Sequence, residues 1–348
     1  MDFQPDYRHF AAVMRNERPA RLPFYDHYFA PNVVEAITGV PYADLLGGDA
    51  ADRAEYFRRY IDFLRAMTFD VVIWEVCSGD PLPSPSALYG GQGPIQTRAD
   101  LEAYPWDELA ALYWRHAAPY FDALRATLPP GMKAVGGVGN GVFELAETLV
   151  GLEYLPFIQT DDPELYDALF ARIGDYLVEL WSEFLPRYGD CFVAARIGDD
   201  LGYKASLLTN PRTVLDQVLP QYRRLIQTIH AAGLPFLWHS CGCIFEVMDE
   251  FIAAGINAKH SNEDIIAPFQ TWIDRYGDRI GLLGGIDMDL LCTAAPAELE
   301  TIVLERGRAW RASARGWALG SGNSIPHYVP PDNYLALIRG GQRLRAEG

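Results

Sequence analysis

The sequence predicts an α/β fold: a single (β/α)8 TIM barrel with an N-terminal helical extension and a long Pro/Gly-rich loop after an early strand. Three observations favour it. Apolar runs rich in β-branched and aromatic residues alternate with amphipathic segments about eight times. Most of these runs end in a polar side chain, and no GxGxxG phosphate loop follows the first of them. A doubly wound open sheet is therefore the less favoured alternative.

The first part of the chain shows this alternation of predicted helices and strands. Apolar spacing over residues 7–18 predicts an opening helix, and residues 21–29 predict the first strand. A helical pattern resumes over 49–67 after an interruption near Pro41. Residues 69–76, FDVVIWEV, form an almost continuous apolar run, which is typical of a parallel strand covered on both faces.

Residues 77–100, CSGDPLPSPSALYGGQGPIQTRAD, are rich in Pro, Ser and Gly. A loop of this length in a compact domain is usually functional or mobile. Because it follows a strand, we expect a lid over the site. An unstructured connection is the alternative.

The remaining strands are expected where apolar runs recur between helical segments. The carboxyl ends of these runs are Asn140, Asp200, Gly242, Glu263, Asp287 and Asn323. The amphipathic segments between the strands predict helices over 163–188, 211–232, 245–254, 268–276 and 296–314. Neither a short repeat nor a linker divides the chain, so we expect one domain over residues 1–348.

The composition limits the classes of function. With 49% hydrophobic residues, the chain can bury a sizeable core and should be globular. A net charge of −17 disfavours binding to nucleic acid or to an anionic membrane, because both require clustered cations. Five cysteines without a small-domain spacing argue against a disulfide framework. We expect a cytoplasmic protein with small-molecule or protein partners, and a homodimer remains open.

Polar side chains at the strand exits predict the site. In a barrel the carboxyl ends of the strands meet on one face, where the active site is expected. The residues expected there are Glu75, Asn140, Asp199, Asp200, His239, Cys241, His260, Glu263, Asp287 and Asn323. The signal is collective, since a single Asp or Asn at such a position could equally cap the next helix.

The stretch LPFLWHSCG, residues 234–242, is the sharpest local feature. His239 and Cys241 are alternate residues of the expected strand and therefore share a face. Imidazole and thiolate suit zinc, and a catalytic zinc takes three protein ligands and leaves one position open. The alternative is a hydrogen-bonded histidine beside a cysteine that packs as a small hydrophobic residue. The role of Cys243 is left undecided.

Two further groups of residues point to a small polar or aromatic substrate. Asp199, Asp200 and Lys204 stand together in GDDLGYK, where paired acids beside a lysine can do acid–base work or orient a substrate. A turn and a helix cap are the alternative. Aromatic side chains near the expected rim could line a flat pocket, although most should belong to the core. They are Trp74, Tyr89, Tyr203, Trp238, Phe245 and Tyr328.

At these residues the chain resembles the uroporphyrinogen decarboxylase superfamily, and within it the corrinoid-linked methyltransferases. The resemblance spans most of the chain. It is strongest from Gly198 to the end, in the runs GDDLGYK, HSCG, YGDRIGLLGGID and GSGNSIPHYVPPDNY. It implies a (β/α)8 barrel, in agreement with the strand count from the apolar runs.

Two departures from the patterns of the superfamily bear on the choice between its decarboxylases and its methyltransferases. The true decarboxylases have an arginine-rich segment near the amino terminus, whereas the stretch after Pro23, FYDHYFAPNVVE, has no arginine. The zinc-dependent coenzyme M methyltransferases bind metal through His-x-Cys and a later cysteine. Here His239 and Cys241 match the pair, and Asn323 stands at the later position. The resemblance therefore implies zinc at the pair, with the third ligand open among Glu75, Cys77, Asp287 and Asn323.

The resemblance implies methyl transfer between a small methoxylated or methylamine-type compound and the cobalt of a corrinoid, with zinc as Lewis acid. The corrinoid would arrive on a partner protein that docks at the open face, with residues 81–93 as one contact. Demethylation of the small compound is the favoured direction. Asp199, Glu75 and Asp287 are the expected catalytic residues. The expected substrate-binding residues are Asn140, Asp200, Lys204, Asn323, Trp74 and Tyr203.

Two other functions stay open. A metal-free decarboxylase or related lyase could use Asp199 and Asp287 on another carboxylated substrate. A barrel without catalytic activity could bind a small molecule or a corrinoid, since a fold alone does not define a function.

Overall fold

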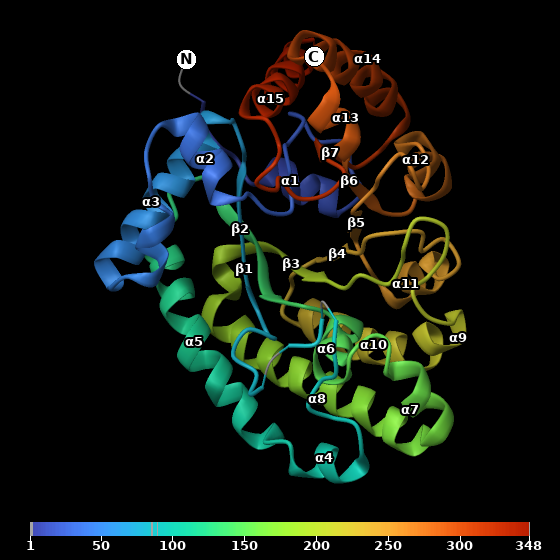
Figure 1. The fold of residues 1–348 in the computed structure, drawn as a ribbon. Coiled ribbons are helices and arrows are strands. Elements are labelled where there is room, and N and C mark those ends of the chain that lie inside the picture. Colours follow the sequence, from blue (N-terminus) through green and yellow to red (C-terminus); the bar gives the residue numbers. More distant parts are fainter. Residues whose placement is uncertain (1–2, 85, 89, 348) are drawn as a thin grey trace.

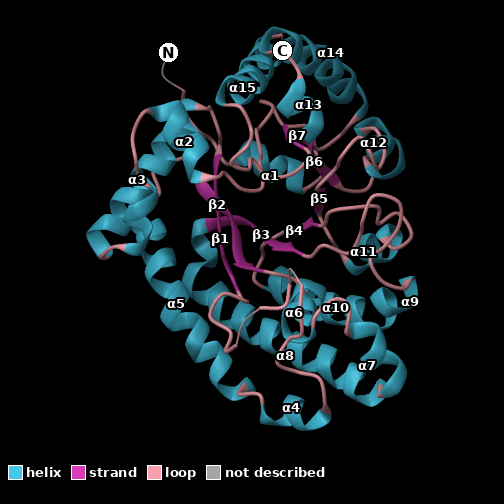
Figure 2. Cartoon of the chain, in the orientation of Figure 1, coloured by secondary structure: helices cyan, strands magenta, loops and turns pink. Residues whose placement is uncertain are grey.

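The computed structural model describes residues 3–84, 86–88 and 90–347. Within them, a 7-stranded parallel sheet curls so that each strand pairs with the next one along the chain. Figure 2 shows the strands at the centre and the helices outside them. The α/β class and a TIM-barrel-like arrangement are confirmed. The strands are β1 (Val71–Cys77), β2 (Lys133–Gly139), β3 (Phe192–Gly198), β4 (Phe236–His239), β5 (Ala258–His260), β6 (Gly281–Ile286) and β7 (Trp317–Ser321).

Helices alternate with the strands and lie around the sheet (Figure 1). The predicted helix over 163–188 coincides with α8. No helix among the described residues combines the length and apolar character required to cross a membrane. The helices are α1 (Arg8–Met14), α2 (Pro31–Thr38), η1 (Ala43–Gly47), α3 (Ala50–Ala66), α4 (Arg98–Ala103), α5 (Trp106–Thr127), α6 (Val142–Val150), α7 (Leu155–Asp161), α8 (Pro163–Tyr188), η2 (Gly189–Cys191), α9 (Pro211–Thr213), the π-helical turn η3 (Val214–Val218), α10 (Leu219–Ala231), α11 (Met248–Ala254), α12 (Phe269–Tyr276), α13 (Met288–Thr293), α14 (Pro296–Ser313) and α15 (Pro331–Ala346).

Burial and close packing explain which residues the strands contain. β3 is buried at every position, as expected for a parallel strand that is covered on both faces. β2 contains Gly136, which has a φ of 141°. A Cβ atom at this position would lie 1.8 Å from the carbonyl oxygen of Trp74. Glycine is therefore required for the close approach of β2 to β1.

The opening helix is shorter than the predicted range of 7–18. Asn16 has a φ of 53°, in the left-handed region, so the helix cannot continue through it. α1 contacts β3, β6 and β7. A Cβ atom at Gly281, the first residue of β6, would lie 2.3 Å from the carbonyl oxygen of Val13. α1 therefore covers the amino-terminal end of the sheet.

The predicted first strand at 21–29 is not a regular strand, which corrects that expectation. Its backbone makes isolated parallel bridges between Phe24 and Leu319 and between Phe29 and Ile325. Leu319 N donates to Pro23 O at 3.0 Å. Pro23 has no N–H group of its own, so it cannot donate to a continuous ladder. The segment lies beside β7, where the predicted first strand would close the barrel, but it does so as an extended connection.

The long loop after β1 is attached to the end of α6. Ala87 N donates to Thr148 O at 3.1 Å, and Ile95 N donates to Leu149 O at 2.9 Å. Ile95 is fully buried. The loop thus packs along a helix that begins at the site end of the sheet, and its expected role as a lid stays a prediction.

Candidate metal centre

Polar side chains gather at the carboxyl-terminal end of the sheet. His239 ends β4 and His260 ends β5. Their Cα atoms are register partners across the two strands, so both side chains lie on the same face. Gly198 is the register partner of His239 on β3, and Asp199 and Asp200 follow it directly. The expected convergence of strand exits is therefore present at three neighbouring strands.

Three of these side chains form a compact set of metal donors. One ligand atom each from Asp200, His239 and Cys241 lies within 4.8 Å of the other two. His239 Nε2 is 3.4 Å from Cys241 Sγ and 4.0 Å from Asp200 Oδ1. Cys241 N donates to Asp200 Oδ1 at 3.0 Å, which holds the carboxylate beside the thiol. A nitrogen, a sulfur and an oxygen donor match the ligand chemistry of zinc.

The donor set is buried on one side and open on the other. The side chain of His239 is 6% exposed, whereas that of Asp200 is 44% exposed. Burial lowers the pKa of His239 well below its usual value, and burial raises the pKa of Cys241 well above its usual value. The imidazole is therefore neutral, as a metal ligand must be. A divalent cation would favour the thiolate, because its charge offsets the cost of burying the anion.

The sequence left the third donor open among four residues: Glu75, Cys77, Asp287 and Asn323. The structure brings a different side chain, the carboxylate of Asp200, close to His239 and Cys241. Among the described residues, none of the first three joins His239 and Cys241 in such a group. Asp287 accepts hydrogen bonds from Asp289 N and Leu290 N and so caps α13. The helix-cap alternative accounts for its position.

Asn323 lies at the donor set but presents its amide N–H groups to it. Asn323 Nδ2 is 3.4 Å from Cys241 Sγ and 3.1 Å from Glu263 Oε1. Asn323 Oδ1 accepts from Ser324 N at 2.8 Å. Asn323 is thus placed to donate to the sulfur, which stabilises a thiolate there.

A second group of candidate donors shares His239. The imidazoles of His27, His239 and His260 also bring ligand atoms within 4.8 Å of one another. The rings of His27 and His239 stack with their centroids 3.6 Å apart. His239 Nδ1 lies 2.9 Å from His260 Nδ1. His239 Nε2 therefore faces Cys241 and Asp200, whereas His239 Nδ1 faces His260. His27 was not recognised from the sequence, because it lies within the irregular segment 21–29.

Glu75 is paired with an arginine that the sequence did not single out. Arg196, on β3, is 1% exposed, and its Nη2 lies 2.6 Å from Glu75 Oε2. Arg196 Nη1 also donates to Tyr25 Oη at 3.0 Å and to His27 O at 2.8 Å. The guanidinium therefore ties β1 and the segment 21–29 to β3 inside the barrel.

Asp199 faces away from the donor set and anchors α6. Asp199 Oδ1 accepts from Phe143 N at 3.1 Å and from Glu144 N at 2.9 Å, at the start of that helix. Tyr222 Oη donates to Asp199 Oδ2 at 3.0 Å. The side chain is fully buried, and burial raises its pKa to about 7. These contacts explain its position structurally, and its expected catalytic role stays a prediction.

Asn140 connects the loop after β1 with α6. Gly79 N donates to Asn140 Oδ1 at 3.1 Å, and Asn140 Nδ2 donates to Glu144 Oε2 at 2.9 Å. Asp200 N donates to the other oxygen of Glu144 at 3.3 Å. Burial, reinforced by Asp199 and Asp200, raises the pKa of Glu144 well above its usual value. Glu144 thus connects Asn140 to the backbone of Asp200.

The structure separates the expected substrate-binding side chains. Trp74 packs on Phe57 and Tyr56 of α3, with ring centroids 4.7 and 5.8 Å apart, so it faces the helices rather than the barrel interior. Tyr203 is 63% exposed and Lys204 is exposed beside it, in the loop after β3. Those two residues remain candidates at the rim, and Trp74 is not brought to the site.

The other aromatic candidates lie in different environments. Trp238 stacks on Phe251 at 4.0 Å and belongs to the core. Phe245 stacks on Trp272 at 4.4 Å. Tyr328 is 62% exposed in the loop after β7. Tyr89 lies outside the described residues.

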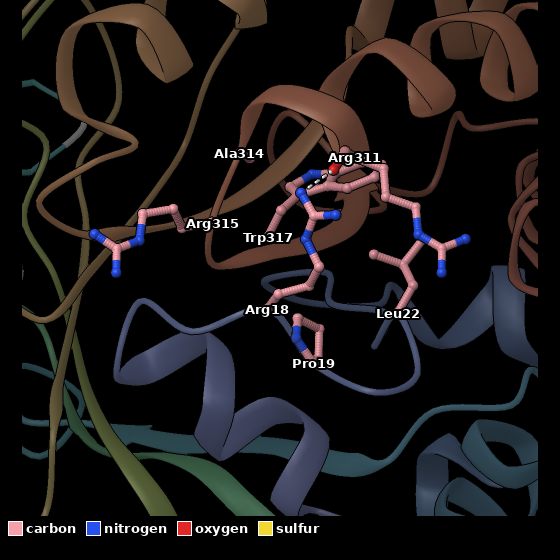
Figure 3. Close-up of a pocket in the computed structure, with 7 residues that line it drawn as sticks. All are labelled: Arg18, Pro19, Leu22, Arg311, Ala314, Arg315 and Trp317. Carbon is pink, nitrogen blue, oxygen red and sulfur yellow. Dashed lines mark hydrogen bonds between the residues drawn. The ribbon is translucent and has the colours of Figure 1, made fainter. Parts of the chain in front are cut away.

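A separate pocket lies at the opposite end of the sheet (Figure 3). Trp317, the first residue of β7, lines it together with Arg18, Arg311 and Arg315. Arg18 Nη2 donates to Arg311 O at 2.9 Å. In Figure 3 the guanidinium groups of Arg311 and Arg315 point away from each other. None of the residues that line this pocket was predicted to belong to the site.

The fold and the donor set define an α/β barrel protein with a candidate metal centre at the carboxyl ends of its strands. The family model described as Uroporphyrinogen decarboxylase (URO-D) matches residues 92–343, more than half of the chain. The chain therefore belongs to the uroporphyrinogen decarboxylase family, and the resemblance seen in the sequence is confirmed.

Among solved structures, a methyltransferase from Methanosarcina mazei is similar to this chain, with a TM-score of 0.75 at 13% identity over 96% of this chain and 97% of that chain. At this identity the likeness concerns the fold. A rutinosidase from Aspergillus niger reaches a TM-score of 0.48 at 11% identity, over 93% of this chain and 97% of that chain, and supports no functional argument. No curated protein is a significant match to the sequence.

Proposed function

We propose that this protein is a methyltransferase that moves a methyl group between a small methylated compound and the cobalt of a corrinoid. The observation that carries the proposal is the set of Asp200, His239 and Cys241 at the carboxyl end of the sheet. Membership of the uroporphyrinogen decarboxylase family is compatible with it. The fold shared with a methyltransferase of Methanosarcina mazei gives general support.

Zinc is the metal that fits these residues best. The three side chains offer N, S and O donors, and the exposed side of Asp200 leaves room for a fourth ligand from the substrate. When bound there, zinc supplies a Lewis acid for the oxygen or nitrogen of a methylated substrate. We place the resident metal at these three residues.

The neighbouring residues hold the donors in position. Cys241 N orients the carboxylate of Asp200, and Asn323 Nδ2 donates towards Cys241 Sγ. Glu144 accepts from Asp200 N, and so fixes the backbone from which that carboxylate projects. These contacts pre-organise the site before a metal or a substrate binds.

The corrinoid would be carried by a partner protein that docks over the open end of the barrel. Tyr203, Lys204 and Tyr328 are exposed in loops at this end, and we assign them to contacts with the substrate or the partner. The loop after β1 is a further contact in this proposal. We favour demethylation of a methoxylated or methylamine-type compound as the direction of transfer.

The test combines metal analysis with a methyl-transfer assay. The purified protein should contain zinc. It should produce the absorbance of methylcobalamin from free cob(I)alamin and a methoxylated aromatic or methylated amine. His239→Ala and Cys241→Ser should lose both zinc and turnover, whereas the exposed-site control His230→Ala should keep both. Protein that binds no zinc at neutral pH and gives no methylcobalamin would contradict the proposal.

A metal-free decarboxylase is the second candidate, because the matching family model bears that description. Such an enzyme needs cations that face the carboxylates of its substrate. Arg196, the arginine inside the barrel, is already bonded to Glu75 and Tyr25. Release of carbon dioxide without any corrinoid would favour this second function over the first.

A further inference from the structure

The last residue of β7 determines where the proton of a neighbouring histidine lies. His260 Nε2 is 3.2 Å from the carbonyl oxygen of Ser321. A carbonyl oxygen has no proton and can only accept a hydrogen bond. His260 Nε2 must therefore carry a proton and donate it.

The charge state of His260 then fixes its other nitrogen. Its ring is fully buried and, among the described residues, has hydrogen-bond partners only in Ser321 and His239, so a positive charge on it would have no carboxylate to balance it inside the barrel. His260 is thus neutral near pH 7, with its single ring proton on Nε2. Its Nδ1 consequently has a free lone pair and can only accept.

This lone pair faces His239. The two Nδ1 atoms are 2.9 Å apart, a distance at which one nitrogen donates to the other. Since His260 Nδ1 is the acceptor, His239 Nδ1 must be the donor. A neutral imidazole carries a single ring proton, and in His239 that proton is the one on Nδ1. Its Nε2 therefore bears the lone pair.

His239 Nε2 is the atom that faces the donor set. It lies 3.4 Å from Cys241 Sγ and 4.0 Å from Asp200 Oδ1. The opposite tautomer would point an N–H bond at the metal position. It would also turn the lone pair of His260 Nε2 towards the carbonyl oxygen of Ser321, which is repulsive. The contacts on both sides of His260 thus favour one tautomer.

We propose that His260 is a positioning residue that, through the carbonyl group of Ser321, holds His239 as the Nδ1–H tautomer and keeps its Nε2 free for a metal ion. The metal part of this inference rests on the proposed function, while the tautomer does not.

The hydrogen bonds from Ser321 through His260 to His239, called the relay below, also distinguish the two candidate groups of metal donors. Both ring nitrogens of His260 are occupied, one by Ser321 and one by His239. His260 therefore has no free lone pair for an ion held among His27, His239 and His260. The ring of His27 instead stacks on His239 and restricts its rotation. We assign metal binding to Asp200, His239 and Cys241 alone.

The direct test is the tautomer of His239 in the wild-type protein. Nitrogen-15 NMR of histidine-labelled protein distinguishes the two ring nitrogens, both in protein as purified and after treatment with a chelator. We expect Nδ1–H for His239 and Nε2–H for His260 in both samples. A proton on His239 Nε2 in the chelator-treated protein, or on His260 Nδ1 in either sample, would overturn the proposal.

A pair of variants tests the consequence for metal binding. His260→Gln retains an amide oxygen to accept and an NH2 group to donate, whereas His260→Leu removes both. Zinc affinity, measured by competition with a chelator, should fall by about 10- to 100-fold in the Leu variant and much less in the Gln variant. His230→Ala, at the other end of the barrel, is the control.

The outcomes separate this proposal from the proposed function. A folded His260→Leu protein with wild-type zinc affinity would overturn the relay. If that variant does not fold, the wild-type tautomer alone decides. The expected tautomer without bound zinc would support the relay and contradict the metal centre. Zinc in the purified protein, together with a proton on His239 Nε2 only after treatment with the chelator, would do the reverse.

Discussion

Arg196 Nη2 lies 2.6 Å from Glu75 Oε2, and Arg196 Nε lies 3.0 Å from the same oxygen. This ion pair joins β3 to β1, which are separated in the sheet by β2. Its side chains are 2% and 19% exposed, so the pair is largely shielded from water. Glu75 was expected to be catalytic or to bind the metal; the structure shows its partner inside the barrel, and its expected catalytic role stays a prediction.

Replacing the arginine should therefore destabilise the fold. Arg196→Met leaves the carboxylate of Glu75 inside the barrel without its partner, and we expect a loss of about 3–5 kcal/mol in the free energy of unfolding. Glu75→Gln combined with Arg196→Met should cost less than the sum of the single changes, because the double variant leaves no uncompensated charge. Denaturant unfolding of the four proteins measures this coupling. Strictly additive effects would show that the pair does not interact in solution.

The order of elements was predictable because it depends on local periodicity. Apolar runs and amphipathic segments mark β1 to β7 and helices such as α8 within the sequence itself. The pairing of Arg196 with Glu75 was not predictable in this way. Arg196 is visible as a charge within the run CFVAARIG, but its partner lies 121 positions away along the chain. Only the folded sheet brings the two together.

Strand alternation explains why Glu75 and Trp74 cannot both face the site. The two residues are neighbours on β1, so their side chains must face opposite sides of the sheet. An interior position for Glu75 therefore implies that Trp74 faces the helices, as observed. The proposed third metal donor, Asp200, is a different case. Asp200 was recognised from the sequence, but its distance from Cys241 depends on how two loops meet.

Asp200 and Asp287 provide a matched comparison for the metal centre. Asp200→Asn weakens a proposed ligand, so zinc affinity should fall by at least about 10-fold. Asp287→Asn removes charge from the cap of α13 and should leave zinc affinity unchanged, with a stability cost of about 1 kcal/mol or less. Chelator competition and thermal unfolding measure the two effects. Loss of zinc from the Asp287 variant alone would restore that residue as the third ligand.

We expect the side chain of Asp199 to contribute mainly to the free energy of unfolding. Asp199→Ala removes the acceptor for Phe143 N and Glu144 N and leaves the hydroxyl of Tyr222 without its partner. We expect a cost of about 2–3 kcal/mol, against about 1 kcal/mol for Tyr222→Phe. Denaturant unfolding gives these values. A folded Asp199→Asn protein that loses turnover far below its Tm would instead support the expected catalytic role.

Glu147 should make the stability of the protein depend on pH. This buried carboxyl on α6 has its pKa raised from 4.5 to about 8, mainly by burial and then by the charges of Asp199 and Asp200. Between these two values the folded protein holds a proton that the unfolded chain releases. Rising pH therefore lowers the free energy of unfolding, by up to roughly 1.4 kcal/mol for each pH unit.

Glu147→Gln removes the titrating carboxyl group. It should therefore remove the contribution of Glu147 to the pH dependence of the free energy of unfolding. Near pH 4.5 the variant and the wild type should be about equally stable, because the wild-type carboxyl is then protonated in the folded state. Near pH 8 the variant should be the more stable of the two, since it avoids burying a charge. Unfolding in urea at several pH values measures the difference, with the exposed Glu153→Gln as control. Parallel stability curves for wild type and Glu147→Gln would mean that Glu147 titrates as an ordinary exposed carboxyl.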